Sequence, residues 1–208
     1  MRKVLMIMGS QRSGTNALFH SLERDDRLVA FNENHPDVFT DFFMKPFEEV
    51  RLVIDRARSV VMLKPISETS RGSLMDLMST YRRYDLHVLW IYRDPVNQIF
   101  SHEKHHEKQQ ISVPLEWYID DYNQRNQKLL DALDAFGSMI TVVSYERLCA
   151  SRGAFEALCA KLDVEGEYLF REDSRSGYVG FDEATIERIQ RETRTTLDGL
   201  NRAETSLH

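Results

Sequence analysis

Cysteine is scarce in this sequence of 208 residues, with only Cys149 and Cys159 present. The two lie ten residues apart in a stretch with helical periodicity, a spacing that suits neither a disulfide framework nor a zinc site. We interpret both as reduced residues of the core. Long apolar runs are also missing: none approaches the roughly 20 residues of a membrane-spanning helix, and the apolar start lacks the length and cleavage site of a signal peptide. We therefore expect a cytoplasmic protein without a transmembrane segment.

An excess of basic residues is the third absence, since the formal net charge is −6. A nucleic-acid partner bound by a broadly basic surface is thereby disfavoured, and an anionic ligand has to be held by a few focused groups. The chain contains no internal repeat, linker or low-complexity tract, so a single domain over 1–208 is expected.

Short apolar runs alternate with helical patterns along the chain. Expected strands are 4–8, 28–31, 59–63, 86–92 and 139–143, and expected helices are 14–24, 46–57, 69–83, 95–108, 114–136, 152–162 and 182–200. Strands that alternate with helices predict an α/β fold with a parallel sheet of about five strands, flanked by helices on both faces. The polar segment 163–181 is expected to be a loop before the last helix, which Asp182 caps.

A glycine-spaced segment, Gly-Ser-Gln-Arg-Ser-Gly-Thr-Asn (9–16), follows the first expected strand and opens the first helix. Its G-x4-G spacing is typical of loops whose backbone N–H groups surround a phosphate. A Walker-A loop would continue with Lys and Ser or Thr, whereas Thr15 and Asn16 stand here, which disfavours ATP or GTP hydrolysis. Arg12 offers a planar fork for a phospho-anhydride without a metal. A simple Gly/Ser turn is the plainer alternative.

Arg93 lies at the carboxyl end of the fourth expected strand, where open α/β sheets bind ligands. Ser101 follows two helical turns later on roughly the same face as the first turn. The pair is expected to grip a second phosphate. The alternative is an Arg93 that pairs with Asp94 beside a solvated serine.

Two of these segments together resemble the motifs of PAPS-dependent sulfotransferases, which use 3'-phosphoadenosine 5'-phosphosulfate (PAPS). Gln-Arg-Ser-Gly-Thr-Asn (11–16) resembles the 5'-phosphosulfate loop, and Tyr-Arg-Asp-Pro-x5-Ser (92–101) resembles the 3'-phosphate motif. Tyr-Glu-Arg-Leu (145–148) is similar to the family's Tyr-Glu-x-Leu stretch, and Arg-Ser-Gly (175–177) to the segment that closes on the 3'-phosphate. The resemblance spans nearly the whole chain as scattered motifs.

The resemblance implies a P-loop kinase-like sheet, PAPS as donor, 3'-phosphoadenosine 5'-phosphate (PAP) as product, and no metal. By position it assigns donor binding to Arg12, Ser13, Gly14, Thr15, Asn16, Arg93, Ser101, Arg175 and Gly177. Arginine at position 12, where small-molecule members usually carry lysine, is similar to the carbohydrate, tyrosylprotein and bacterial branches. It implies a small-molecule or glycan acceptor, such as a carbohydrate, lipid or natural product with a hydroxyl or amine, rather than a simple phenol or steroid.

Sulfuryl transfer needs a base for the acceptor and positive charge on the departing oxygen. Glu33 follows the second strand in a stretch (31–36) similar to the Glu-x-His-Phe-Phe region where glycosaminoglycan sulfotransferases carry their base. We expect Glu33 to be the base, with His35 as its rival. Lys64 ends the third strand, is similar to the Lys of the family's Lys-x-Pro segment, and is expected to stabilise the departing oxygen with Arg12. A solvated Glu33, a loop-capping His35 and a surface Lys64 are the plainer alternatives.

The sequence is also compatible with other functions and with features outside the predicted donor site. A nucleotide or small-molecule kinase with a degenerate P-loop is the alternative function, and a non-catalytic nucleotide-binding module is a third. His102, His105 and His106 have metal-like spacing on one helix, although a solvated or acceptor-facing helix is preferred. The chain is short for the family, so we expect an acceptor pocket that is either open or completed by the second subunit of a homo-oligomer.

Overall fold

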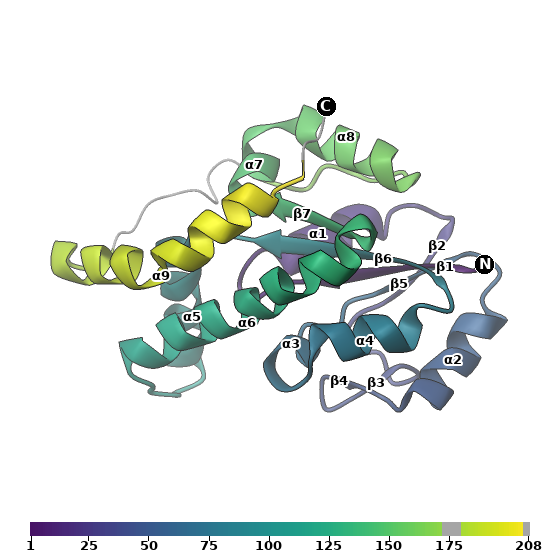
Figure 1. Ribbon diagram of the computed structural model, residues 1–208, viewed down its shortest axis with the longest axis horizontal. Helices are drawn as coiled ribbons and strands as arrows, with labels where there is room; N and C mark the ends of the chain where they lie inside the picture. Colours follow the sequence, from purple (N-terminus) through teal and green to yellow (C-terminus); the bar gives the residue numbers. More distant parts are fainter. Residues whose placement is uncertain (172–179, 206–208) are drawn as a thin grey trace.

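Five parallel strands form the central sheet of the computed structural model, which describes residues 1–171 and 180–205 (Figure 1). The sheet has the order β2-β5-β1-β6-β7. The strands are β1 (Lys3–Met8), β2 (Leu28–Phe31), β5 (Val60–Leu63), β6 (Asp85–Tyr92) and β7 (Ile140–Ser144). All neighbouring strands pair in parallel, so the predicted five-stranded α/β fold is confirmed.

Both faces of the sheet are covered, which explains the continuously apolar strands. Alternate residues of β1 enter two different cores: Val4 and Met6 lie in one, Leu5 and Ile7 in the other. Helices α2 (Phe47–Arg56), α4 (Leu74–Tyr81), α6 (Leu115–Phe136) and α9 (Glu183–Ala203) pack on the first face, and α1 (Thr15–Leu22), α7 (Tyr145–Ala150) and α8 (Arg152–Leu162) on the second (Figure 1). Cys149 and Cys159 are free and buried in the second core, as predicted.

Helix α5 (Pro95–Lys108) packs beside α6 and α9 around a third, smaller core that includes Val96, Ile99 and Ile189. Asp94 caps α5 by accepting a hydrogen bond from the backbone N–H of Asn97 at 3.0 Å. Asp182 caps α9 in the same way, as predicted, through the N–H of Thr185.

The prediction of one helix over 69–83 is wrong. The chain instead forms α3 (Glu68–Arg71) and α4, which are separated at Gly72 and Ser73. Gly72 is extended, and the Ser73 hydroxyl accepts from the N–H of Asp76 to cap α4, a local bond that competes with continued helix. A hairpin of β3 (Phe39–Thr40) and β4 (Phe43–Met44), the short helix α7 and a 3-10 turn at Gly137–Met139 were not predicted either.

The order of strands creates a switch point between β1 and β6. The chain leaves β1 toward β2 on one side of the sheet and leaves β6 toward β7 on the other, although β1 and β6 are neighbours. Ligands of open α/β sheets bind outside the carboxyl ends of strands at such a point. The loop 9–14 follows β1 and Arg93 follows β6, so both lie at this switch point. Across residues 1–171 and 180–205, no helix combines the length and apolarity needed to cross a membrane.

Candidate functional site

The loop after β1 has an unusual backbone that only its glycines allow. Gly9 (φ 151°) and Gly14 (φ 104°) adopt positive φ values, and a Cβ atom would lie 2.3 Å from the Ile91 carbonyl oxygen at Gly9 and 2.2 Å from the Tyr145 ring at Gly14. Arg12, at the loop's turn, also has a positive φ of 66°. Gly14 provides no side-chain cap for α1, so the first N–H groups of this helix remain available to an anion.

Two serine hydroxyls of this loop, Ser10 Oγ and Ser13 Oγ, are buried. Neither has a hydrogen-bond partner within the described residues. Buried polar atoms in native proteins nearly always have a partner. The loop therefore has hydrogen-bonding capacity that the described protein groups do not use.

Arg93 is held by the start of α7. Its Nε lies 3.8 Å from Glu146 Oε1, and its guanidinium lies 4.8 Å from the centre of the Tyr145 ring. Glu146 also accepts from the N–H of Asp94 at 3.2 Å, and burial raises the pKa of its carboxyl group. The Tyr-Glu pair that the sequence singled out thus orients the arginine at the end of β6. Arg93 does not pair with Asp94, which instead caps α5.

Arg12 joins the two predicted phosphate-binding segments. Its Nε donates to Ser101 Oγ at 3.2 Å across 89 residues of sequence. Burial, and then the nearby charge of Arg93, lower the pKa of Arg12. Two arginines that repel each other at one site are the arrangement expected where an anion binds between them.

These groups line a common hollow of about 210 Å³, which we call the arginine cleft. It is bordered by Arg12, Gly14, Thr15, Asn16, Ala17, Arg93, Ser101 and Tyr145. An adjoining hollow of about 280 Å³ shares Arg12, Arg93 and Ser101 and extends along α5 past Lys104 and Lys108. Positive charge is therefore concentrated at the switch point, although the net charge of the whole chain is negative.

Lys64 lies at the carboxyl end of β5 and is only 5% exposed, so it is not a surface lysine. Its ammonium group donates a hydrogen bond to Asn16 Oδ1 and lies 3.5 Å from Glu33 Oε1. Burial lowers the pKa of Lys64, while the Glu33 carboxylate opposes this shift. Asn16, Glu33 and Lys64 were predicted from three separate segments, and the structure brings them together.

Glu33 uses one carboxylate oxygen for Lys64 and leaves the other, Oε2, buried without a hydrogen-bond partner among the described residues. His35 lies differently: its ring packs edge-on against Phe31, and its Nδ1 is 3.4 Å from the N–H of Asp37. The contacts of His35 are thus those of a residue that organises the turn.

Glu33 borders a further hollow of about 380 Å³, which we call the glutamate cleft. It is lined by Gln11, Arg12, Thr15, Asn16, Glu33, Phe42, Ile66, Ser67, His105, His106 and Gln109. Arg12, Thr15 and Asn16 border both clefts, so the two meet at the loop after β1.

A buried arginine that the sequence reasoning missed supports this junction. Arg125 of α6 is 5% exposed, donates to Thr69 Oγ1 at 2.8 Å and pairs with Asp121 at 2.6 Å. Thr69 in turn lies 3.5 Å from the Gly9 carbonyl oxygen and donates to that of Ile66. The sequence did contain a signal for its burial: Arg125 falls on the same face of the predicted helix as Tyr118, Tyr122 and Leu129, which are buried.

The histidines of α5 form an aromatic cluster. The His102 ring is 2% exposed and its centre lies 4.5 Å from that of His106, while His106 Nδ1 is 3.0 Å from the Tyr118 hydroxyl. Burial, His106 and Arg125 lower the pKa of His102 to about 3. Within the described part of the chain, no group of three or more His, Cys, Asp or Glu side chains is arranged to hold a metal ion.

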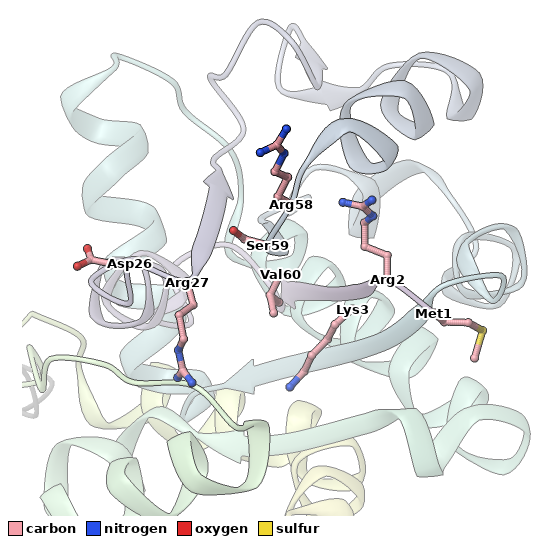
Figure 2. Close-up of a pocket in the computed structure, with 8 residues that line it drawn as sticks. All are labelled: Met1, Arg2, Lys3, Asp26, Arg27, Arg58, Ser59 and Val60. Carbon is pink, nitrogen blue, oxygen red and sulfur yellow. The ribbon is translucent and has the colours of Figure 1, made fainter.

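A larger hollow of about 890 Å³ lies at the opposite, amino-terminal ends of the strands and carries four basic residues. Figure 2 shows Arg2 and Arg58 extending to one side and Lys3 and Arg27 to the other. Lys3 already donates to the Leu162 carbonyl oxygen, and Arg27 pairs with Asp25 at 2.7 Å. These charges do not converge on one point, so we place the functional site at the switch point. Arg175 and Gly177 lie outside the described residues.

The site therefore has the parts that a doubly phosphorylated nucleotide needs: a glycine-shaped loop at a helix N-terminus, serine hydroxyls to which no described group bonds, and two neighbouring arginines. By this test the residues present fit PAPS or PAP.

Comparison with proteins of known structure places this architecture in a defined class. A sulfotransferase from Alicyclobacillus acidocaldarius superposes with a TM-score of 0.69 at 17% identity, over 97% of this chain and 95% of that one. The likeness shows that this chain has the sulfotransferase fold.

Two further structures agree. Mouse sulfotransferase SULT7A1, solved in complex with PAP, gives a TM-score of 0.63 at 10% identity, over 96% of this chain and 87% of that one. The sulfotransferase domain of the Synechococcus PCC 7002 olefin synthase gives 0.55 at 13% identity, over 100% and 98%. No family profile and no curated protein sequence matches the chain.

Proposed function

We propose that this protein is a sulfotransferase that takes its sulfuryl group from PAPS and transfers it to a hydroxyl or amine of an acceptor bound in the glutamate cleft. The observation that carries the proposal is the contact between Arg12 and Ser101 beside Arg93. It joins two segments that resemble the 5'-phosphosulfate and 3'-phosphate motifs at one cleft. The sulfotransferase fold and the PAP bound to a mouse protein of this fold support it.

The proposed donor site uses the loop and the two arginines. The N–H groups at the start of α1, with Arg12 and Thr15, hold the 5'-phosphosulfate, and Arg93 with Ser101 holds the 3'-phosphate. When bound, PAPS supplies a sulfuryl group whose bond to the 5'-phosphate oxygen breaks as the acceptor atom bonds to sulfur. Arg12 and Lys64 place positive charge where this oxygen becomes negative.

Glu33 is the proposed general base. Its Oε2 is the oxygen that Lys64 does not occupy, and it receives the acceptor's proton during attack. Lys64 and Asn16 hold the other side of the carboxylate near the loop. Arg125 is a positioning residue in this scheme, since it connects α6 to Thr69 and thereby to the Gly9 and Ile66 carbonyls.

A kinase with a degenerate P-loop is disfavoured by the same contacts. Asn16 stands where a Walker-A loop offers a hydroxyl to Mg²⁺, and its side-chain oxygen accepts from Lys64. The lysine near the loop is thus Lys64, which follows β5 and contacts Glu33 and Asn16, and no lysine stands directly after Gly14.

Thermal unfolding with ligands tests the proposal. PAP at about 100 times its Kd is expected to raise Tm by roughly 5–10 °C without Mg²⁺, because selective binding to the folded state stabilises it by about 2.7 kcal/mol. Shifts with 5'-AMP and ADP are expected to be smaller, since neither carries a 3'-phosphate.

The matched variant is Arg93→Gln, in which the preference for PAP over 5'-AMP is expected to disappear while the smaller 5'-AMP shift persists. Arg58→Gln, far from the site at the opposite end of the strands, is the control. Equal stabilisation by PAP and by ADP with Mg²⁺ would favour the kinase.

A further inference from the structure

The β3–β4 hairpin presents an aromatic side chain at the glutamate cleft. Its two turn residues, Asp41 (φ 49°) and Phe42 (φ 67°), adopt left-handed conformations although neither is glycine. Hairpin turns of this kind usually contain Asn, Asp or Gly, because a Cβ atom makes positive φ costly, so Phe42 is the unusual residue of the two. Phe42 is also 56% exposed, although its side chain is large and apolar.

Contacts behind the turn hold it in place. The N–H of Met44 donates to Glu68 Oε1 at 2.8 Å, and the guanidinium of Arg71 lies 3.7 Å from the centre of the Phe43 ring. Both partners belong to α3, which follows Lys64 after a short turn. Phe42 is thus fixed through its neighbours, and its exposed ring is accessible to a molecule in the cleft.

The rest of the glutamate cleft is mainly polar. Phe42 and Ile66 are its apolar residues, whereas Gln11, Ser67 and Gln109 offer neutral hydrogen-bonding groups. His105 and His106 add ring nitrogens from α5. A flat apolar acceptor would cover these groups and leave them without partners, at a cost in binding. An acceptor with hydroxyls around a ring would satisfy them and still offer a C–H face to Phe42.

We propose that Phe42 is the acceptor-binding platform of this enzyme and that the acceptor is a polyhydroxylated ring, such as a sugar or cyclitol. One face of the ring stacks on Phe42, its hydroxyls bind the polar wall, and one hydroxyl meets Glu33. This inference rests on the proposed sulfotransferase function, since it assigns the acceptor of that same site.

The test measures transfer of ³⁵S-sulfate from labelled PAPS to methyl β-glucoside, N-acetylglucosamine and cellobiose, with 2-naphthol as the flat apolar probe. The sugar probes are expected to be sulfated and 2-naphthol is not. Phe42→Leu keeps an apolar side chain but removes the flat ring, so it is expected to raise KM for the sugar by about 3- to 10-fold, the usual scale of aromatic stacking, with kcat within twofold. Phe42→Trp is expected to restore KM. Leu52→Ala, at an exposed apolar position on α2, is the control and leaves both constants unchanged.

The inference is overturned if KM is unchanged in Phe42→Leu, if only kcat falls in that variant, or if 2-naphthol is preferred over the sugars. If no sugar is sulfated while PAP still stabilises the protein, the acceptor assignment fails and the donor assignment stands. If PAP does not stabilise the wild-type protein, the proposed function fails and this inference fails with it.

Discussion

Lys64 illustrates how neighbours set the chemistry of a single residue. A lysine with 5% exposure is costly to keep charged, and burial accordingly lowers its pKa. The Glu33 carboxylate, 3.5 Å away, opposes this shift because it favours the ammonium form. Lys64 therefore places its amino group at a defined point beside Glu33, whose Oε2 has no hydrogen-bond partner among the described residues. In the proposed reaction this is the point at which a leaving oxygen becomes negative.

At this scale we predict that Glu33→Gln lowers turnover by about 10²-fold or more, because the amide cannot accept the acceptor's proton. PAP affinity is expected to stay within a few-fold, since Glu33 borders the glutamate cleft and not the arginine cleft. Steady-state rates and PAP titration measure the two effects. Normal turnover in Glu33→Gln, together with loss in His35→Gln, would transfer the role to His35.

Side chains of helix α5 lie in three different environments: the basic hollow beside Arg93, the glutamate cleft and a buried aromatic cluster. Asn97, Ser101 and Lys104 lie four and three residues apart and border the basic hollow with Arg93. His105 borders both that hollow and the glutamate cleft. His102 turns inward, where its ring packs against aromatic neighbours and its Nε2 has no hydrogen-bond partner among the described residues.

The buried His102 predicts a pH dependence of stability. Its pKa falls from 6.5 to about 3 in the folded protein, so between these values the unfolded chain binds the extra proton. This residue therefore lowers the free energy of unfolding as pH falls from 6.5 toward 3, by at most about 1.4 kcal/mol per pH unit. In His102→Gln the slope over pH 4–6.5 is expected to flatten. Urea unfolding at several pH values measures it, and an unchanged slope would contradict the prediction.

On the scale of the whole molecule, the C-terminal segment completes the sheet. β7 is an edge strand, and its exposed side is covered by residues that follow α9. The N–H of Thr205 donates to the Val142 carbonyl at 2.8 Å, and the Thr205 hydroxyl accepts from the N–H of Val142 at 3.0 Å. Glu204 accepts from the N–H of Ser144 at 3.1 Å and from the Tyr92 hydroxyl at 3.1 Å.

Loss of the hydrogen bonds that Glu204 and Thr205 make with β6 and β7 is expected to destabilise the fold. The double substitution Glu204→Ala and Thr205→Ala deletes the side-chain hydrogen bonds to β6 and β7, and we predict a loss of about 2–4 kcal/mol in the free energy of unfolding. Arg202→Ala, at an exposed position on α9, is the matched control and is expected to change stability by less than about 0.5 kcal/mol. Chemical denaturation of the three proteins decides the matter.

The sequence by itself determined the strands of the sheet and the glycine-spaced loop that follows the first of them. Runs such as 4–8 and 86–92 are apolar throughout because both faces of a parallel strand are buried, and this local pattern is readable without tertiary information. The spacing of Gly9 and Gly14 likewise reflects backbone conformations that only glycine allows at these contacts. The carboxyl-end positions of Glu33, Lys64 and Arg93 followed from the strands that precede them.

Only the tertiary structure decided which of these residues meet and how they are charged. The contact of Arg12 with Ser101 spans 89 residues, and that of Lys64 with Asn16 spans 48, so no local pattern encodes either. The hairpin that carries Phe42 has strands of two residues, too short for an alternating pattern, and is stabilised by distant α3. The pKa values of Lys64 and His102 are also lowered by burial beneath elements that are remote in sequence. These shifts could therefore not be predicted from the local sequence.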